Sequence, residues 1–457
     1  MSSALVIGGG LAGCEAAWQL AVRGVAVDLY EMRPSLPTPA HRTAWLGELV
    51  CSNSLKSDAL DTASGLLKQE LRALGSMILE TAEQTSVPAG SALAVDRDRF
   101  ASRITERLQQ HPLVRIIRQE VKQLPSGKPL VVASGPLTSE ALTEHLTACL
   151  GHDNLYFYDA IAPLIDADSL DRRKIFAASR YEKGTPAYLN CPLNRQQYQT
   201  FYEHLVAAET VPLHTCEKDL FFQACLPVEE LARRGPQTLS FGPFRPVGLI
   251  DPRTGKRPWA VVQLRQDNAP ASIYNMVGCQ TRMRQNEQHR IFRLIPGLEQ
   301  ARFLRYGSVH RNTYVCAPRI LEATLAVRGQ GDLFLAGQIT GAEGYMEAVA
   351  TGLLAGLNVA RQLRDLPPLT PPETTALGSL CHYLDAADDA HFQPMNVNFG
   401  LMPPLDHGIR KKTERRRLMI RRAQEDLHIW MRKRGVEPRG EPGTVSEEIS
   451  CLPGSGA

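Results

Sequence analysis

The chain has 457 residues, of which 43% are apolar and 22% charged, and its formal net charge is +3. This composition excludes a wholly disordered chain, and no apolar run is long enough for a membrane-spanning helix. The N-terminus lacks the basic-then-apolar layout of a signal peptide, so we expect a cytoplasmic protein. Ten cysteines without a CxxC pair, and histidines without an HxxxH or HExxH pattern, predict neither a metal site nor a compact disulfide framework.

The start of the chain has the order of a dinucleotide-binding unit. Residues 4–7 (ALVI) are typical of a buried parallel strand, and the motif GGGLAG follows at residues 8–13. Its glycines permit a tight turn, the approach of a pyrophosphate and close packing of the helix expected over residues 14–22. A strand over residues 25–30 then leads into an acidic residue that can accept hydrogen bonds from a ribose. The residues expected to bind the dinucleotide are Gly8, Gly9, Gly10, Leu11, Ala12, Gly13 and Glu31.

A second glycine-rich unit favours FAD over NAD. Residues 333–336 read as a strand, residues 337–344 as a glycine-rich turn and residues 346–363 as a helix rich in small residues. Flavoproteins use such a late unit to hold the FAD, with a helix N-terminus facing the anionic edge of the flavin. The alternative is an ordinary helix–sheet crossover, in which tight packing also favours Gly and Ala. The cofactor-binding residues expected here are Gly337, Gly341, Gly344 and Tyr345.

The chain is expected to divide into a nucleotide-binding domain and an inserted domain. Residues 128–136 fit the strand that precedes an insertion, and residues 186–314 replace βαβ alternation with short strand-like runs, prolines and paired charges. The predicted fold class is α/β, a FAD-binding Rossmann-like (glutathione-reductase-like) domain with an inserted α+β domain and a helical basic C-terminal segment. The expected boundaries are 1–185 and 315–440 for the FAD-binding domain, 186–314 for the inserted domain and 441–457 for a frayed tail.

A basic block lies near the C-terminal end of the sequence. Residues 410–434 hold eleven Lys or Arg and three acidic residues, a local charge of +8. Such a block is typical of a segment that binds nucleic acid, and we expect deletion of residues 410–457 to weaken RNA binding far more than FAD binding. The alternative is a solvated helix face that binds nothing, with Trp430 at the edge of a core. The residues expected to contact RNA here are Arg410, Lys411, Lys412, Arg415 and Arg416.

Two cysteines are candidates for a catalytic thiol. Cys51 lies in ELVCSNSLK, close to Lys56 and to an expected helix start, which favours a thiolate; a buried structural thiol is the alternative. Cys225 lies in FFQACLPVEE before a helix opened by Pro227, and its apolar neighbours alone favour an inert thiol. The other eight are expected to be packing residues, with Cys14 on the inward face of the first helix.

Strings spread along the sequence match one known family. They are VIGGGLAGCEAAWQL, YEMRP, ELVCSNSLKS, VPAGSALAVDRDRF, ASGPLTS, FYDAIAP, AYLNCPLN, PVGLIDPRTGKRPWAVVQLRQDN, YNMVG, GSVHRNTYV, LFLAGQITGAEGYMEA and NFGLMPPL. By these strings the sequence closely resembles the folate- and FAD-dependent tRNA (uracil-5-)-methyltransferase family, TrmFO, over nearly its whole length. CSNSLKS and HRNTYV are the most diagnostic among them.

The resemblance implies FAD, NADPH or NADH, and 5,10-methylenetetrahydrofolate as cofactors, and formation of 5-methyluridine at position 54 of the tRNA T-loop. A cysteine thiolate would add to C6 of the uracil, and C5 would capture a one-carbon unit that is carried on flavin N5 and reduced by the flavin hydride. By motif, Cys225 matches the nucleophile and Cys51 the second, proton-handling thiol, and the reverse assignment also fits. Tyr345 is implied to stack on the pterin or flavin, with a packing role as the alternative. Arg282 and Arg284 are implied to meet RNA phosphates or the folate glutamate tail, with solvated surface arginines as the alternative.

The sequence departs from the family at two places. Gln223-Ala224 precedes Cys225 where the family commonly has Glu-Gly, so a carboxylate and a flexible backbone position are missing there. Cys279 stands where an aromatic residue is more usual and adds a thiol. Two rival functions stay open, a related enzyme that methylates ribosomal RNA and a catalytically silent flavin-dependent RNA-binding protein. Analysis of the RNA product separates them, because a pure binder forms no methyluridine.

Overall fold

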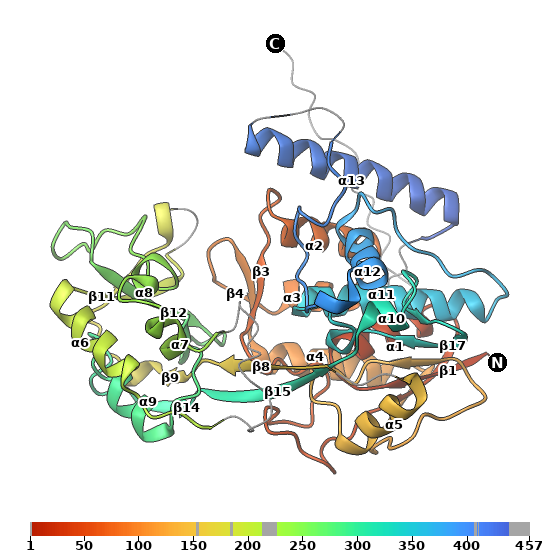
Figure 1. Ribbon diagram of the computed structural model, residues 1–457, viewed down its shortest axis with the longest axis horizontal. Coiled ribbons are helices and arrows are strands. Elements are labelled where there is room, and N and C mark those ends of the chain that lie inside the picture. The colour runs from red at the N-terminus through yellow and green to blue at the C-terminus, as the bar shows by residue number, and fades with distance from the viewer. Residues whose placement is uncertain are drawn as a thin grey trace.

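The chain forms two domains, each with its own sheet and hydrophobic core. The computed structural model describes residues 2–151, 155–182, 186–212, 226–405, 409 and 411–437. Figure 1 shows the domain that holds both β1 and β17 at the right and the inserted domain at the left. None of the helices in the described ranges is both long and apolar enough to cross a membrane.

The first sheet is the parallel sheet expected for a dinucleotide-binding domain. Strand β1 lies between β2 and β7, and every pairing in this sheet is parallel except that of β16 with β17. Four of the five residues of β1 are buried, as its apolar run predicts. In sheet order the strands are β16 (Ala326–Val327), β17 (Gln330–Leu335), β7 (Leu130–Val132), β1 (Ser3–Ile7), β2 (Ala26–Tyr30) and β6 (Val114–Ile117).

Two helices of this domain pack closely against each other. Helix α1 (Leu11–Ala21) follows β1 and is buried along its whole length, while α11 (Tyr345–Gln362) follows β17. A Cβ on Gly352 would lie 2.2 Å from the Ala12 carbonyl oxygen, so only glycine allows α11 this approach to α1. Because each helix begins where a parallel strand ends, both N-termini lie at the carboxyl-terminal edge of the sheet.

The other elements of this domain cover that helix pair and the sheet. The C-terminal helix α13 contributes buried Met419, Ala423, Leu427, Trp430 and Met431 to the core, so Trp430 is an edge-of-core residue. The helices are α2 (Ala63–Ala73), α3 (Met77–Gln84), α4 (Arg97–Gln110), α5 (Glu140–Leu150), α10 (Ala317–Ile320), α12 (Ala376–Ala386) and α13 (Lys412–Arg434), with short turns η4 (Gln338–Thr340) and η5 (Asp389–His391). A small sheet has the order β3 (Ser54–Ser57), β5 (Ala92–Val95), β4 (Ser86–Val87).

The inserted domain is an antiparallel sheet covered by short helices. Its core takes apolar residues from β11, β12 and α6. In sheet order the strands are β10 (Phe176–Ala177), β11 (Tyr188–Leu193), β12 (Ala260–Gln266), β13 (Ile273–Val277), β9 (Leu164–Asp166) and β14 (Phe303–Arg305). The helices are α6 (Arg195–Val206), α7 (Val228–Arg233), α8 (Thr238–Phe241) and α9 (Gln285–Phe292), with short turns η1 (Ala167–Ser169) and η2 (Arg180–Glu182).

The second sheet takes in more of the chain than the expected range 186–314. Strands β9 and β10 precede residue 186, yet β9 pairs with β13 and β14, and β10 pairs with β11. A two-stranded ribbon of β8 (Leu155–Ile161) and β15 (Ser308–Tyr314) carries the chain between the domains (Figure 1). The sheet therefore spans residues 164–305, because its first strands are specified by partners far along the chain and carry little local pattern.

Candidate active site

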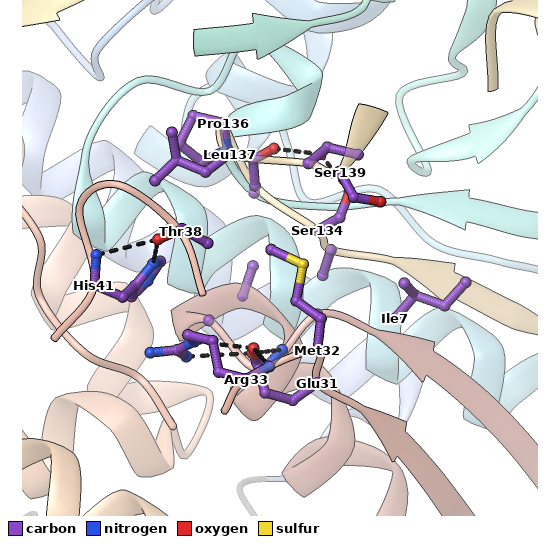
Figure 2. Close-up of a pocket in the computed structure, with 18 of the residues that line it drawn as sticks. Ile7, Glu31, Met32, Arg33, Thr38, His41, Ser134, Pro136, Leu137 and Ser139 are labelled. Carbon is purple, nitrogen blue, oxygen red and sulfur yellow. Dashed lines mark hydrogen bonds and ion pairs between the residues drawn. The ribbon is translucent and has the colours of Figure 1, made fainter. Parts of the chain in front are cut away.

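A cavity of about 1010 Å³ lies at the carboxyl-terminal edge of the parallel sheet, where ligands bind in such folds. We call it the glycine-rich cavity. Its lining comes from distant parts of the chain, chiefly residues 7–12, residues 133–139 and the start of α11. Figure 2 shows Glu31 paired with Arg33 on one side of the cavity and Pro136 with Leu137 on the other.

The glycines of the first motif have different tasks. Gly8 has φ +107°, a conformation that favours glycine, and a Cβ on Gly13 would lie 1.8 Å from the Gly8 carbonyl oxygen. Gly10 lines the cavity, and a Cβ there would meet no atom within 4 Å. No side chain of the described residues caps the N-terminus of α1, so its first N–H groups are available to bind an anion. Gly8, Gly9, Gly10, Leu11 and Ala12 line the cavity, whereas Gly13 packs the helix on the strand.

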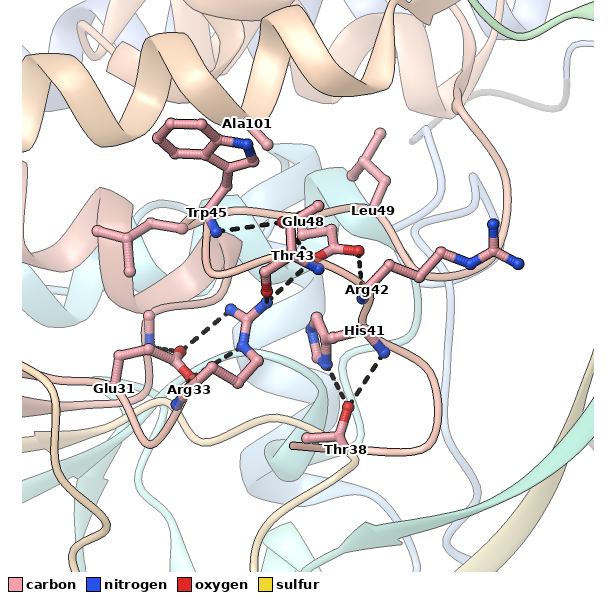
Figure 3. A network of polar contacts seen from close by, with 12 residues as sticks. Glu31, Arg33, Thr38, His41, Arg42, Thr43, Trp45, Glu48, Leu49 and Ala101 are labelled. Carbon is pink, nitrogen blue, oxygen red and sulfur yellow. Dashed lines mark hydrogen bonds and ion pairs between the residues drawn. The ribbon is translucent and has the colours of Figure 1, made fainter. Parts of the chain in front are cut away.

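Glu31 lines the glycine-rich cavity, but other groups of the protein already hold its carboxylate. The N–H of Gly9 donates to Oε2 at 3.0 Å, and the backbone N–H and Nε of Arg33 each donate to Oε1 at 2.9 Å. Burial alone would raise the pKa of Glu31, but the hydrogen bonds and charge of Arg33 outweigh it and lower the pKa. Arg33 also donates to Glu48 at 3.0 Å, and Figure 3 shows it between the two carboxylates. The sequence prediction missed this pairing, which fixes Glu31 as an anion.

The second glycine-rich unit supplies the opposite wall. Gly337 lines the glycine-rich cavity, and a Cβ there would lie 2.8 Å from the Cβ of Ala12. Gly344 is the N-cap of α11, and in the ranges that the structure describes no side chain caps this helix either. Gly341 lines neither this cavity nor the one described next; it packs against Phe392. Two uncapped helix N-termini therefore meet at this edge, and their partial positive charges favour an anionic ligand.

A second cavity of about 1190 Å³ holds Cys51, and we call it the cysteine cavity. It shares Val50, Pro136, Leu137, Gln338 and Tyr345 with the glycine-rich cavity, so the two adjoin. The backbone N–H of Cys51 donates to the Tyr345 hydroxyl at 2.9 Å. A half-buried thiol thus stands beside the dinucleotide-binding edge, with its backbone held by a residue that lines both cavities.

Positive charge near Cys51 comes from arginines and not from a helix start. Strand β3 separates Cys51 from α2, which begins at Ala63, so the expected helix dipole does not act on it. Arg97 donates to the carbonyl oxygen of Cys51 at 2.8 Å, and Arg305 donates to the same oxygen at 3.1 Å. A third guanidinium, that of Arg265, donates to Asn53 at 2.8 Å. These three residues come from α4, β14 and β12, and no local spacing in the sequence connects them with Cys51.

Lys56 closes one side of the cysteine cavity. Its Nζ donates to Glu347 at 2.8 Å and also to Asn396. Glu347 is almost fully buried in the first turn of α11, and its Oε2 has no hydrogen-bond partner within the described part of the chain. A Cβ on Gly344 would lie 2.3 Å from that oxygen, so glycine is needed for this approach. Lys56 is therefore an anchor to α11 rather than a partner of Cys51.

The structure describes seven of the ten cysteines, and four of these are fully buried thiols, whereas Cys149 is exposed and is not the packing residue that the sequence predicted. Burial raises the pKa of Cys14, Cys191, Cys279 and Cys381, which keeps them protonated. The additional thiol of Cys279 is accordingly a packing residue, as Cys14 is. Cys225, the expected nucleophile, and Gln223-Ala224 lie outside the described residues. Pro227 is the N-cap of α7, as expected.

The residues expected to contact RNA have different surroundings. Arg282 donates to the Glu230 carboxylate and to the carbonyl oxygen of Val211, so it is engaged within the inserted domain. Arg284 is exposed and has a long ion pair of 3.8 Å with Glu209. On α13 and just before it, Lys411, Lys412 and Arg415 are exposed, and Arg416 lies over the ring of Phe399. Arg410 lies outside the described residues.

Comparison with known proteins gives the chain its family. Residues 3–367 match the family model described as glucose inhibited division protein A. The chain is 55% identical to a protein of Moorella thermoacetica, covering 93% of this chain and 97% of that protein. It is 56% identical to one of Pelotomaculum thermopropionicum, covering 92% and 97% respectively. Both are named methylenetetrahydrofolate--tRNA-(uracil-5-)-methyltransferase TrmFO. The chain belongs to the TrmFO family.

A solved structure agrees with the fold. Aquifex aeolicus GidA in its form II crystal superposes with a TM-score of 0.69 at 16% identity, covering 95% of this chain and 73% of that one. At this identity the likeness concerns the fold alone. With the parallel sheet and the family match, it confirms the predicted α/β fold class with a FAD-binding Rossmann-like domain. Among the described residues, no three His, Cys, Asp or Glu side chains gather as a metal site.

Proposed function

We propose that this protein is a methylenetetrahydrofolate-dependent, FAD-mediated tRNA (uracil-5-)-methyltransferase that acts at uridine 54 of the T-loop in the cytoplasm. The observation that carries the proposal is Cys51 in a cavity that adjoins the glycine-rich cavity, in a chain of the TrmFO family. A thiol that must reach a nucleic-acid base and a reduced cofactor together needs this arrangement.

The residues of the glycine-rich cavity fit FAD. Its pyrophosphate would lie against Gly9 and Gly10, where the first turn of α1 offers uncapped N–H groups and no Cβ intrudes. The second uncapped N-terminus, that of α11, would face the anionic edge of the flavin. When bound, FAD supplies the hydride for the reductive step, with NADPH or NADH as the source of electrons. Glu31 would then act mainly by fixing Gly9 through its hydrogen bond and only secondarily through the ribose.

Two thiols share the work on the uracil. Cys225 adds to C6, which makes C5 a carbon nucleophile for the one-carbon unit of 5,10-methylenetetrahydrofolate, and Cys51 handles the C5 proton. Tyr345 holds the backbone of Cys51 and lines both cavities, where its ring stacks on the pterin or flavin. Arg97 and Arg305 fix the carbonyl side of the same peptide. RNA phosphates are held by the basic residues at α13 and by Arg284.

The test is an assay with unmodified tRNA transcript, NADPH and methylenetetrahydrofolate labelled in its one-carbon unit. Wild type runs beside Cys51→Ala and Cys225→Ala, with Cys279→Ala as a control because that thiol is buried and protonated. We expect label at C5 of uridine 54 with wild type and Cys279→Ala, and none with the other two. Label that survives Cys225→Ala would move the nucleophile to Cys51. No label with wild type despite bound FAD would contradict the proposal and favour another RNA or a binding-only protein.

A further inference from the structure

One face of the inserted domain carries positive charge that no predicted site explains. It is formed by residues 172–181 and 241–257, which we call the inserted-domain basic surface. The first segment has four Lys or Arg and no acidic residue, and the second has four and one. Arg180 joins the segments, since its Nη1 donates to the carbonyl oxygens of Arg245 at 2.6 Å and of Val247 at 2.9 Å.

Three cations of this surface are available to a ligand. Arg245, Lys256 and Arg257 are exposed, and among the described residues none of their side chains forms an ion pair or hydrogen bond. The single acidic residue, Asp251, is buried and is neutralised by Arg253 at 2.7 Å. Acidic residues outside the two segments pair with Arg173 at 3.0 Å and Lys174 at 2.7 Å. The unbalanced charge that the surface presents to solvent is therefore that of the three available cations, and it is the electrostatic footprint of a polyanion-binding site.

Exposed aromatic rings accompany the charge. Tyr181 is 62% exposed and Phe241 76% exposed, unusual values for large apolar side chains in a domain with a full core. Tyr181 also has φ +56°, and its N–H donates to the carbonyl oxygen of Gly248 at 2.9 Å, so the backbone is fixed while the ring faces solvent. Aromatic rings among unpaired cations are the means by which proteins stack unpaired bases.

The surface is connected with the Cys51 segment through one strand. The Arg180 guanidinium that joins its two segments also donates to Gln263 of β12 at 3.0 Å. Two residues further along β12, on the same face of the sheet and about 7 Å away, Arg265 donates to Asn53 at 2.8 Å. The surface is therefore linked through β12 to Arg265, which lines the cysteine cavity.

We propose that the inserted-domain basic surface binds the RNA substrate, with phosphates on Arg245, Lys256 and Arg257 and an unpaired base stacked on Tyr181. The inference rests on the proposed function, because it assigns an RNA interface to that enzyme. It adds a contact region distinct from α13, which Figure 1 shows across the top of the first domain, whereas α8 lies in the inserted domain at the left.

The experiment measures the affinity for unmodified tRNA transcript at several salt concentrations. The variant with Arg245→Ala, Lys256→Ala and Arg257→Ala is compared with wild type. A matched control carries Arg99→Ala, Arg103→Ala and Lys128→Ala, three exposed cations that line neither cavity. We expect the surface variant to lower the magnitude of the slope of log affinity against log salt by about two to three. The control should keep the wild-type slope to within about one.

Single substitutions test the stacked base. Tyr181→Ala should weaken binding roughly tenfold, and Tyr181→Phe, which keeps the ring, should restore it. Circular dichroism and FAD content check that each variant is folded. If wild type binds and methylates tRNA but the surface variant keeps the wild-type salt slope, this inference is overturned and the proposed function is not. An equal decrease of the salt slope in the surface and control variants also overturns it. Wild type that does not bind tRNA overturns the proposed function together with the inference.

Discussion

At the scale of single residues, the glycines of the first motif separate cofactor binding from folding. Gly10 and Gly13 stand three positions apart and belong to the same turn, yet their surroundings differ. A Cβ on Gly10 projects into open space in the glycine-rich cavity, whereas one on Gly13 collides with the backbone of Gly8. The same substitution should therefore have different consequences at the two sites.

We expect Gly10→Ala to leave the unfolding free energy of the cofactor-free protein within about 0.5 kcal/mol of wild type. Its FAD affinity should fall at least about tenfold, because the methyl group occupies the place of the pyrophosphate. Gly13→Ala should lower the unfolding free energy by about 3 kcal/mol, because the added methyl group collides with backbone that cannot move aside. Urea unfolding and flavin fluorescence titration measure both quantities. Equal destabilisation by the two variants would contradict the assignment.

Arg305 is a half-buried cation held beside Cys51 without a carboxylate. Among the described residues it forms no ion pair, and it donates to the carbonyl oxygens of Val50, Cys51 and Ala162. Burial, together with the charge of Arg97, lowers the pKa of Arg305 to about 10. Keeping a guanidinium in this environment is energetically unfavourable, so we infer that Arg305 positions the Cys51 peptide and does not mainly stabilise the fold.

Arg305→Met should lower the kcat of methylation at least about tenfold. The variant loses the hydrogen bonds to the carbonyl oxygens of Val50 and Cys51, so the Cys51 peptide can move. The Kd for tRNA should stay at the wild-type value, because Arg305 does not belong to any basic surface. Arg305→Lys keeps the charge but not the forked donors, so it should recover little of the activity. A Kd that rises in step with the loss of kcat would instead indicate an RNA contact.

At the scale of elements, a buried carboxylate on one helix caps another. Glu70 of α2 is 1% exposed, and its two oxygens accept the N–H groups of Ala376 and Leu377 at 2.7 and 2.8 Å. These are the first residues of α12, whose N-cap Thr375 supplies a further acceptor. Burial raises the pKa of Glu70 to about 7, although the two N–H groups act in the opposite direction.

Glu70 should make stability fall as pH rises. The folded state binds its proton more tightly than the unfolded state, where the pKa is near 4.5. The resulting stabilisation is full below about pH 4.5 and is lost as pH rises through about 7, an amount of about 3 kcal/mol. Glu70→Gln has no proton to release, so only wild type loses this stabilisation as pH rises. The unfolding free energy of wild type minus that of the variant should therefore fall by about 3 kcal/mol over this range. A pH-independent difference, measured by urea unfolding, would contradict the raised pKa.

Helix α13 combines two tasks that the sequence could not separate. Most of its basic residues are exposed, while Met419, Leu427 and Trp430 belong to the core of the first domain. Deleting residues 410–457 would therefore remove buried apolar surface as well as charge. A deletion would destabilise the first domain, so it cannot test the expected selective loss of RNA binding. Substitution of Lys412 and Arg415, both exposed, leaves the packed face intact and tests the charge alone.

At the scale of the whole molecule, the two ends of one domain meet at a single ligand site. Residues 7–12 and the start of α11 line the same cavity, although more than three hundred residues and the inserted domain lie between them. The inserted domain has a separate core. A ligand in the glycine-rich cavity therefore couples directly to the first domain and only indirectly to the second.

FAD at about one hundred times its Kd should add about 2.7 kcal/mol to the unfolding free energy of the first domain. Hydrogen exchange should slow in α1 and α11 when FAD is added, while α6 in the inserted domain should exchange as before. Gly10→Ala, with its FAD affinity lowered about tenfold, should cut the added free energy to about 1.4 kcal/mol and weaken the protection at the same FAD concentration. Equal protection of α6 would show that the two domains unfold as one unit.

The sequence by itself determined the elements whose information is local. The strand of residues 4–7, the glycine turn after it, the first helix and the later unit around Gly337 each follow from adjacent residues, and the structure contains all of them. The first helix, expected over residues 14–22, runs from Leu11 to Ala21, so the local pattern predicted its presence but not its start. The family strings are local in the same sense. Local patterns could also indicate an inserted domain, but not its first strands, which pair with partners far along the chain.

Only the tertiary structure decided what surrounds the functional groups. Arg97, Arg265 and Arg305 converge on the Cys51 segment from three elements, and Arg33 takes the carboxylate of Glu31. Charge and hydrogen bonding act through space over a few ångströms, so residues distant in sequence set the environment of each site. Local spacing predicts where a turn or helix forms, whereas the partners of a buried polar group depend on how the elements pack.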